Sequence, residues 1–188
     1  TLSSSSAASD VYKRQDVRVP KKNIIGERNR GWYYAMAALD FERLVVPVGG
    51  FRRTFEELVL WARETKRGRE VLSNEPLIRD KLAEMAIEID VAYMFFWQTA
   101  WMLDRGLLPN IEASALKLVT TQLSHKLAST AMDILGPYGQ LENDTKWAPL
   151  KGRMCIGYLD SISALVGAGT SEIQRNIIAI RGLKLPWA

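Results

Sequence analysis

Three short segments of the sequence carry residues whose types and spacing could do chemistry. The first, "LDFER", interrupts an otherwise apolar helical stretch with a carboxylate and an arginine. Asp40 and Arg43 lie three positions apart and therefore share one face of a helix, whereas Glu42 points elsewhere. Taken alone, the segment is most simply interpreted as a solvated charged patch.

The other two segments are turns beside helices. In "GAGTSE", residues 167–172, two glycines allow the backbone to approach a ligand closely, and the following helix offers free N–H groups to an anion. A glycine before a capped helix is also a common way to change the direction of the chain between two helices. "DILGPYG", residues 133–139, is a helix terminator followed by a turn and indicates no chemistry by itself.

The single histidine and the single cysteine exclude several other kinds of site. His125 and Cys155 cannot form a metal cluster, and they do not indicate a Cys/His catalytic pair. One cysteine also excludes an internal disulfide framework and suits a reducing compartment. His125 lies in a helical stretch with no partner apparent in the sequence, so we interpret it as structural or solvated.

Charge and hydropathy argue against two classes of partner. Lys and Arg number 25 against 21 Asp and Glu, and the net charge of +4 is dispersed along the chain. Even the dense basic stretch "RETKRGRE" contains acids, which disfavours nucleic-acid binding. The sequence contains no apolar run as long as a membrane span and no secretory signal. We therefore expect neither nucleic acid nor a membrane as a partner.

The N-terminal residues differ from the rest of the chain. Residues 1–15 lack periodicity and are interpreted as a disordered or non-native leader. Residues 16–28 contain "DVRVP", whose alternation predicts one strand ended by Pro20. Because a single strand cannot form a sheet alone, we expect this strand and its linker to be the remnant of a missing β-domain of a larger protein.

Residues 29–188 are predicted to form an all-α, up-and-down helical bundle, because apolar residues recur at three- and four-residue spacing. Pro47 and Gly49–Gly50 interrupt the first helical stretch, and Ser171 followed by Gln174 matches a capping box at the last one. The aromatic stretch "YMFFWQTAW" is interpreted as core or subunit interface. The predicted helices span residues 31–46, 55–65, 75–106, 108–136, 157–167 and 170–182.

The ordered combination of segments resembles one known family. "DVRVP", "IGERNRGW", "ALDFERLVV", "LAEMA", "DILGPYG" and "GAGTSEIQRNIIAIRGLKLP" together resemble the C-terminal helical domain of the acyl-CoA dehydrogenases, preceded by the last strand of their middle β-domain. The resemblance covers residues 16–187, and "GTSEIQRNIIA" is its most specific part. It implies an FAD-dependent enzyme that desaturates an acyl-CoA between Cα and Cβ. In that family a glutamate takes the α-proton and flavin N5 takes the β-hydrogen as hydride.

The position of the glutamate differs between branches of this family. Medium- and short-chain members carry it immediately before the Gly-Thr of the final loop, where this sequence has Ala168. The isovaleryl-CoA and long-chain branches carry it in the first long helix of the domain, and the matching position here is Glu42. The resemblance therefore implies Glu42 as the catalytic base.

The resemblance assigns further roles by position. Asp40 and Arg43 match residues that contact the CoA portion or orient the substrate. The Ala168 N–H would donate to the thioester carbonyl, and Gly169 would line the same pocket. The residues that match FAD contacts at the last helix are Thr170, Ser171 and Glu172.

A second set of implied FAD contacts involves a neighbouring subunit. The family segment that matches "DILGP" reaches the FAD of that subunit, although Pro137 stands where the family shows a glycine. An arginine near the second long helix usually meets the flavin diphosphate; "KRGRE" departs from the family's Arg-x-x-Phe-Gly pattern and offers Arg67 and Arg69. The residues matched in the first segment are Asp133, Ile134, Leu135, Gly136 and Pro137.

The implied partners are an acyl-CoA substrate, an electron-transferring flavoprotein, and other subunits in a homodimer, homotetramer or hetero-oligomer. The implied compartment is the bacterial cytoplasm rather than the mitochondrial matrix, and no metal is implied. Because the family needs two further domains to complete its pockets, we expect this chain alone to be inactive. Three alternatives stay open: a non-catalytic partner subunit of a heteromeric acyl-CoA dehydrogenase, an acyl-CoA oxidase relative, and a cofactor-free helical interaction module.

Overall fold

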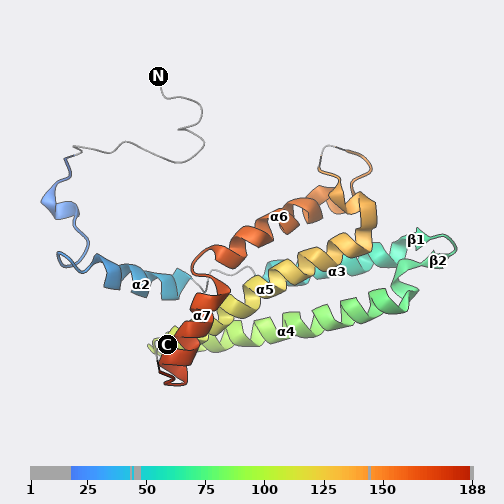
Figure 1. Ribbon diagram of the computed structural model, residues 1–188. Helices are drawn as coiled ribbons and strands as arrows, with labels where there is room; N and C mark the ends of the chain where they lie inside the picture. Colours follow the sequence, from blue (N-terminus) through green and yellow to red (C-terminus); the bar gives the residue numbers. More distant parts are fainter. Residues whose placement is uncertain (1–17, 43, 45–47, 144, 187–188) are drawn as a thin grey trace. The chain divides into compact units, whose positions relative to one another are not determined.

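The computed structural model describes residues 18–42, 44, 48–143 and 145–186, which are mostly helical (Figure 1). The α-helices are α2 (Gly31–Glu42), α3 (Val48–Glu64), α4 (Pro76–Asp104), α5 (Asn110–Leu135), α6 (Arg153–Val166) and α7 (Ser171–Ile177), and α7 continues as the π-helix η5 (Ile178–Gly182). The 3₁₀-helices are η1 (Lys21–Asn23), η2 (Leu72–Asn74), η3 (Gly136–Gln140) and η4 (Pro149–Gly152). A two-stranded hairpin pairs β1 (Lys66–Arg67) with β2 (Glu70–Val71).

The chain divides into a small unit, Thr1–Ala37, and a larger unit, Ala38–Ala188. The larger unit is the predicted bundle, in which α5 is central and contacts α3, α4, α6 and α7 (Figure 1). A short connection after α4 and a longer one after α5, which contains η3 and η4, reverse the chain direction, as an up-and-down bundle requires (Figure 1). In the smaller unit, the Tyr34 hydroxyl accepts a hydrogen bond from the Glu27 N–H at 3.1 Å. The predicted boundaries after residues 15 and 28 stay predictions.

The core lies along the inner faces of α3, α4 and α5, and the sequence spacing explains it. On α4, Ile78, Leu82, Met85 and Ile89 follow one another at four- and three-residue steps, so they share one face, and all four are buried. The α3 residues Phe51, Leu58 and Ala62 and the α5 residues Leu123, Leu127 and Ile134 oppose them in two adjoining clusters.

Glycine and proline set the ends of the long helices where they were predicted. α4 begins at Pro76, whose missing N–H costs nothing in a first helical turn, and Gly106 follows its end with φ +72°. Gly136, with φ +60°, ends α5. The predicted interruption near Pro47 also occurs, because α2 ends at Glu42 and α3 begins at Val48.

Several local predictions differ from the structure. Gly49 and Gly50 lie in the first turn of α3 and not in the break between α2 and α3. α6 begins four residues before Gly157, because a single glycine inside a helix costs only about 1 kcal/mol. The hairpin around Gly68 was not predicted. Residues 18–20 have no regular secondary structure; the strand predicted over residues 16–20 begins outside the described residues and stays a prediction.

The cap of the last helix is one residue earlier than predicted. Thr170 rather than Ser171 is the N-cap, and its hydroxyl accepts a hydrogen bond from the Ile173 N–H at 3.4 Å. Gln174 therefore does not act in a capping box with Ser171. Its side chain turns inward instead, and its contacts are described with the site below.

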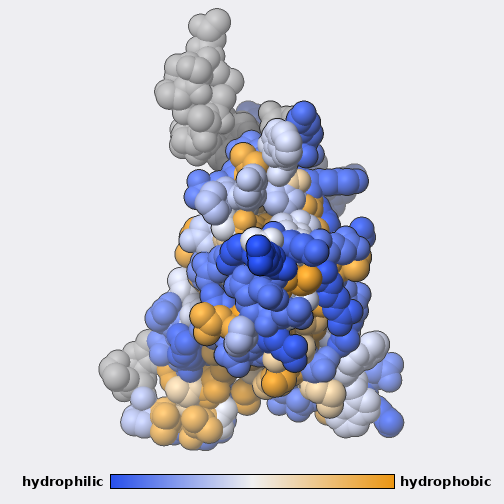
Figure 2. All heavy atoms as spheres, turned by 90° about the vertical axis from the view of Figure 1, so that its right-hand side faces the viewer, coloured by the Kyte–Doolittle hydropathy of each residue, from blue (hydrophilic) through white to orange (hydrophobic). Residues whose placement is uncertain are grey.

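The aromatic stretch of α4 is divided between the core and the surface. Phe96 packs against the core, whereas Met94, Trp97 and Trp101 are 71%, 62% and 55% exposed. With Ile87 and Val91 these three residues form the outer apolar face of α4. Figure 2 shows hydrophobic residues among hydrophilic ones along the lower edge of the molecule. A face of this kind commonly marks an interaction surface.

The ion pair between Arg153 and Glu57 joins α6 to α3 and predicts an acid-sensitive contribution to stability. The hydrogen bond from Arg153 lowers the pKa of Glu57 below its usual 4.5, with Arg53 adding to the shift. A lowered carboxyl pKa stabilises the fold above the unfolded value, and this contribution is lost as the pH falls below 4.5. We expect Glu57→Gln to lower the free energy of unfolding by about 0.5–1 kcal/mol at pH 7.

Urea unfolding at pH 7 and at pH 3 measures this effect. The difference between Glu57→Gln and the original chain should shrink at pH 3, where the native carboxylate is itself being protonated. Glu56→Gln, at the neighbouring exposed position, is the control. A difference that is equally large at both pH values would contradict the electrostatic explanation.

Candidate functional site

The loop between α6 and α7 adopts an unusual backbone. Gly167 closes α6, its N–H donating to Ser163 O at 2.9 Å. The next two residues both have positive φ, +54° at Ala168 and +94° at Gly169. Glycine adopts this region freely, but an alanine there is disfavoured by about 1–2 kcal/mol. The surrounding structure must therefore hold Ala168 in place.

Two buried side chains hold the carbonyl groups of this loop. Lys117 of α5 is 4% exposed, and its Nζ donates to Gly169 O at 2.6 Å and, over a longer 3.5 Å, to Leu165 O. Gln174 of α7 is fully buried, and its Nε2 donates to Ala168 O at 3.0 Å and to Gly169 O at 3.3 Å. Sequence reasoning missed both contacts. In the sequence, Lys117 lies at helical spacing from the polar residues Ser114, Thr120 and Thr121, so its local context did not indicate the first contact.

A cleft of about 600 Å³ lies beside this loop, between α5, the end of α6 and the start of α7. It brings together the predicted residues Thr170, Ser171 and Glu172. We call it the α7 cleft. Its other lining residues are Gln122, His125, Lys126, Ser129, Leu165, Val166 and Arg175.

Neighbouring groups favour the ionised forms of two side chains in the α7 cleft, Glu172 and Lys126. The backbone N–H of Glu172 and the Thr170 hydroxyl lower the pKa of the Glu172 carboxyl, with smaller contributions from Arg175 and Lys117. The pKa of Lys126 is raised by its hydrogen bonds to Glu84 and Glu88 of α4, at 2.7 and 2.5 Å. Both groups therefore carry their charge at neutral pH.

His125 has a partner that its helical context did not reveal. Its Nδ1 lies 3.0 Å from Ser161 Oγ, and that hydroxyl donates its own hydrogen to Tyr158 O at 2.6 Å. Because the serine hydrogen is engaged, Nδ1 is the donor, and in a neutral ring Nε2 is left as an acceptor. His125 is thus held in one tautomer at the wall of the α7 cleft.

A second cleft, of about 450 Å³, lies at the hairpin end of the bundle and is lined by Arg67, Ile134 and Leu135, among others. Arg67 donates to Ile134 O and pairs with Glu75, each over 3.4 Å. Ile134 and Leu135 are 2% and 3% exposed and belong to the core, so their side chains serve packing. We call this cleft the hairpin cleft.

The other residues that were predicted to contact the FAD of a neighbouring subunit lie close to these in the chain. The Asp133 carboxylate is exposed and pairs with Lys81 at 2.6 Å. Gly136 turns the chain after α5, and Pro137 follows it in η3. Arg69 is exposed in the turn of the hairpin.

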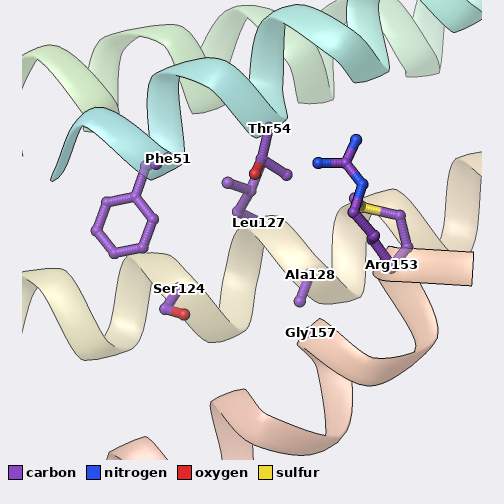
Figure 3. A pocket seen from close by; sticks show the side chains of 9 residues that line it. Phe51, Thr54, Ser124, Leu127, Ala128, Arg153 and Gly157 are labelled. Atoms are coloured by element: carbon purple, nitrogen blue, oxygen red, sulfur yellow. The ribbon is translucent and has the colours of Figure 1, made fainter. Parts of the chain in front are cut away.

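A pocket of about 270 Å³ lies between α3, α5 and α6, and none of the predicted site residues lines it (Figure 3). Phe51, Leu127 and Ala128 give it an apolar wall, and Thr54 and Ser124 add hydroxyls (Figure 3). The guanidinium of Arg153 lies at one side and is already paired with Glu57. Among the described residues, no group of three or more His, Cys, Asp or Glu side chains could hold a metal ion.

The charged segment "LDFER" is only partly described. Glu42 is the last residue of α2 and is exposed. Arg43 and the side chain of Asp40 lie outside the described residues. The catalytic and CoA-contacting roles of this segment therefore stay predictions. None of the described helices combines the length and the apolar content that a membrane span requires.

Comparison with known proteins gives consistent matches for the helical part of the chain. The family model described as "Acyl-CoA dehydrogenase, C-terminal domain" matches residues 29–183. The acyl-CoA dehydrogenase FadE26 of Mycobacterium tuberculosis is 32% identical over 182 residues, which cover 92% of this chain and 44% of that protein. The CarC subunit of the caffeyl-CoA reductase–Etf complex of Acetobacterium woodii is 28% identical over 176 residues, covering 92% of this chain and 44% of CarC.

Solved structures agree with the sequence matches. The crystal structure of the ChsE4–ChsE5 complex from Mycobacterium tuberculosis superposes with a TM-score of 0.81 at 31% identity, covering 92% of this chain and 45% of that one. The chain thus spans less than half the length of the relatives it matches.

Proposed function

Since the chain belongs to the acyl-CoA dehydrogenase family by its C-terminal helical domain, we propose that it forms this part of a longer FAD-dependent enzyme that desaturates acyl-CoA thioesters. In this proposal Glu42 removes the α-proton. When bound, FAD would supply flavin N5 as the hydride acceptor for the β-hydrogen, and an electron-transferring flavoprotein would reoxidise the reduced flavin. The name of the relative CarC, a subunit of an Etf complex, supports the last step.

The observation that carries the proposal is the α7 cleft beside the Ala168–Gly169 loop. Its volume lies in the range of small-molecule sites, and its wall combines apolar side chains with hydroxyl and charged groups, as a flavin with its polar edge requires. Thr170, Ser171 and Glu172, which we assign to FAD, all line it. The residues present therefore fit the cofactor.

The same loop supports the assignment of the thioester contact. Ala168 is exposed, and its N–H donates to no acceptor in the part of the chain that the structure describes. We assign it, with Gly169, to the thioester carbonyl, where negative charge develops as the α-proton leaves. The Ala168 methyl group cannot take a proton. A carboxylate from another segment must do so, and we assign this role to Glu42, with Asp40 and Arg43 orienting the substrate.

The hairpin cleft supports an oligomer in which FAD contacts two subunits. Its residues Arg67, Ile134 and Leu135 belong to a different cleft from Thr170–Glu172. We assign Asp133–Pro137 and the nearby arginines Arg67 and Arg69 to the FAD of a neighbouring subunit. Because the side chains of Ile134 and Leu135 are in the core, they would contribute backbone groups. The outer apolar face of α4 offers a surface for assembly.

A second candidate function is a non-catalytic subunit of a heteromeric acyl-CoA dehydrogenase. The observation that favours it is the likeness to a solved complex of two different proteins, ChsE4 and ChsE5. In that case Glu42 would be incidental. The relatives named above are bacterial proteins, and we propose the bacterial cytoplasm as the compartment.

FAD titration of the full-length protein that contains this chain tests the enzyme proposal. We expect saturable binding of about one FAD per subunit, seen as quenching of flavin fluorescence, and weaker binding of riboflavin because it lacks the adenosine diphosphate portion. Full-length protein that binds no FAD would contradict the proposal and favour the cofactor-free interaction module.

A further inference from the structure

The burial of Lys117 is unusual for a charged side chain. An ammonium group loses its hydration inside a protein, and this is costly unless hydrogen bonds replace it. Lys117 is 4% exposed within α5. Its hydrogen bonds to the main-chain oxygens of Leu165 and Gly169 help to offset the cost of its burial, and both oxygens lie at one place in the fold.

That place is the junction of α6 with the following loop. Leu165 O, at 3.5 Å from Lys117 Nζ, belongs to the last turn of α6, where carbonyl groups lack helical partners and the helix dipole is negative. Gly169 O, at 2.6 Å, belongs to the loop itself. The ammonium therefore ties the end of α6 to the loop.

Gln174 holds the same loop from the side of α7. Its Nε2 donates to Ala168 O and Gly169 O, so both carbonyls of the two left-handed residues have a buried donor. With both oxygens held, the Ala168–Gly169 and Gly169–Thr170 peptide planes cannot rotate without breaking buried hydrogen bonds. This restraint explains how Ala168 keeps a backbone conformation that alanine disfavours.

We propose that Lys117 and Gln174 are positioning residues, which fix the loop so that the Ala168 N–H is directed at the thioester carbonyl. The inference rests on the proposed function for its catalytic consequence, but not for its structural part. Neither side chain touches the reacting atoms in this scheme. Both act through the main chain, and an oxyanion donor is effective only when it is held in place before the reaction.

Hydrogen exchange of the 188-residue chain tests the structural part without any cofactor. The probe is the Gly167 amide, whose hydrogen bond to Ser163 O lies at the end of α6. In Lys117→Met, which keeps the length but loses the donor, we expect its exchange to speed by about 10- to 100-fold, the effect of losing a hydrogen bond from a charged group. Thr120→Val is the matched control, because Thr120 is buried one turn away and bonds only within α5.

Two further variants keep the test decisive. Lys117→Arg retains a charged donor and should stay closer to the original rate than Lys117→Met. Gln174→Leu removes the second donor and should also speed exchange at Gly167, so it decides the matter if Lys117→Met does not fold. Gly167 exchange that is unchanged in Lys117→Met and Gln174→Leu relative to Thr120→Val would overturn the proposal.

Kinetics of the full-length enzyme test the catalytic part. A misdirected Ala168 N–H should lower kcat by about 10- to 100-fold with little change in KM, because the interaction matters most in the transition state. Faster exchange in an enzyme whose kcat is unchanged would refute the catalytic role of the two residues. Faster exchange in a protein that binds no flavin would refute the proposed function and leave the loop restraint standing.

Discussion

Glu42→Gln in the full-length enzyme is expected to abolish substrate-dependent flavin bleaching, with kcat falling by about 10²–10⁴-fold. Glutamine has nearly the same shape as glutamate but cannot accept the α-proton. FAD content and acyl-CoA binding should change little, because Glu42 is exposed at the end of α2 and its loss leaves no cavity. Anaerobic mixing with acyl-CoA, followed by flavin absorbance, measures the rate.

The control for this experiment is Glu56→Gln, another exposed carboxylate, on α3. It should bleach at the original rate. If Glu42→Gln also bleached at that rate, the base would have to lie elsewhere and the isovaleryl-CoA and long-chain placement would be wrong. A full-length protein that binds FAD but never bleaches, even with Glu42 intact, would instead favour the non-catalytic partner subunit.

Gly152→Ala is expected to lower the free energy of unfolding by about 2–5 kcal/mol, from backbone strain together with a steric clash. Gly152 precedes α6 with φ +70°, a region that alanine disfavours. An added Cβ would also lie 2.6 Å from the main-chain atoms Asn143 N and Glu142 C. Neither atom belongs to a flexible side chain, so relief requires a shift of the loop that packs before α6.

Gly68→Ala separates these two causes. Gly68 has nearly the same φ, +67°, but an added Cβ there would meet nothing within 4 Å. The loss should therefore be about 1–2 kcal/mol, from backbone strain alone. Urea unfolding of the two variants and the original chain measures the difference. If Gly152→Ala and Gly68→Ala lowered the free energy of unfolding equally, the clash with residues 142–143 would contribute nothing to the destabilisation.

The helical class and the ends of α4 and α5 were predictable because local chemistry determines them. The four- and three-residue steps of Ile78, Leu82 and Met85 define a buried face, and Pro76 and Gly136 restrict the backbone wherever they occur. The hairpin at residues 66–71 was not predicted, because four strand residues around one glycine produce no periodic pattern. The capping box was displaced by one residue, since Thr170 and Ser171 are both good caps and the sequence alone does not choose between them.

The candidate site was predictable only where it is contiguous in the chain. The motif singled out Thr170–Glu172, and these residues line the α7 cleft, while their contact with FAD stays a prediction. Ile134 and Leu135 also follow a motif, but the packing of α5 against α3 and α4 directs their side chains into the core. His125 had no apparent partner because Ser161 lies on another helix.

The sequence by itself determined the helical class, the ends of the long helices α4 and α5 and, through the order of its motifs, the acyl-CoA dehydrogenase family. Each of these depends on residues close together in the chain. The tertiary structure alone decided that Lys117 reaches Gly169 across 52 positions and that Gln174 supports the loop rather than caps a helix. Such contacts depend on the axial position and rotation of α5, α6 and α7 relative to one another. Local periodicity does not encode these quantities.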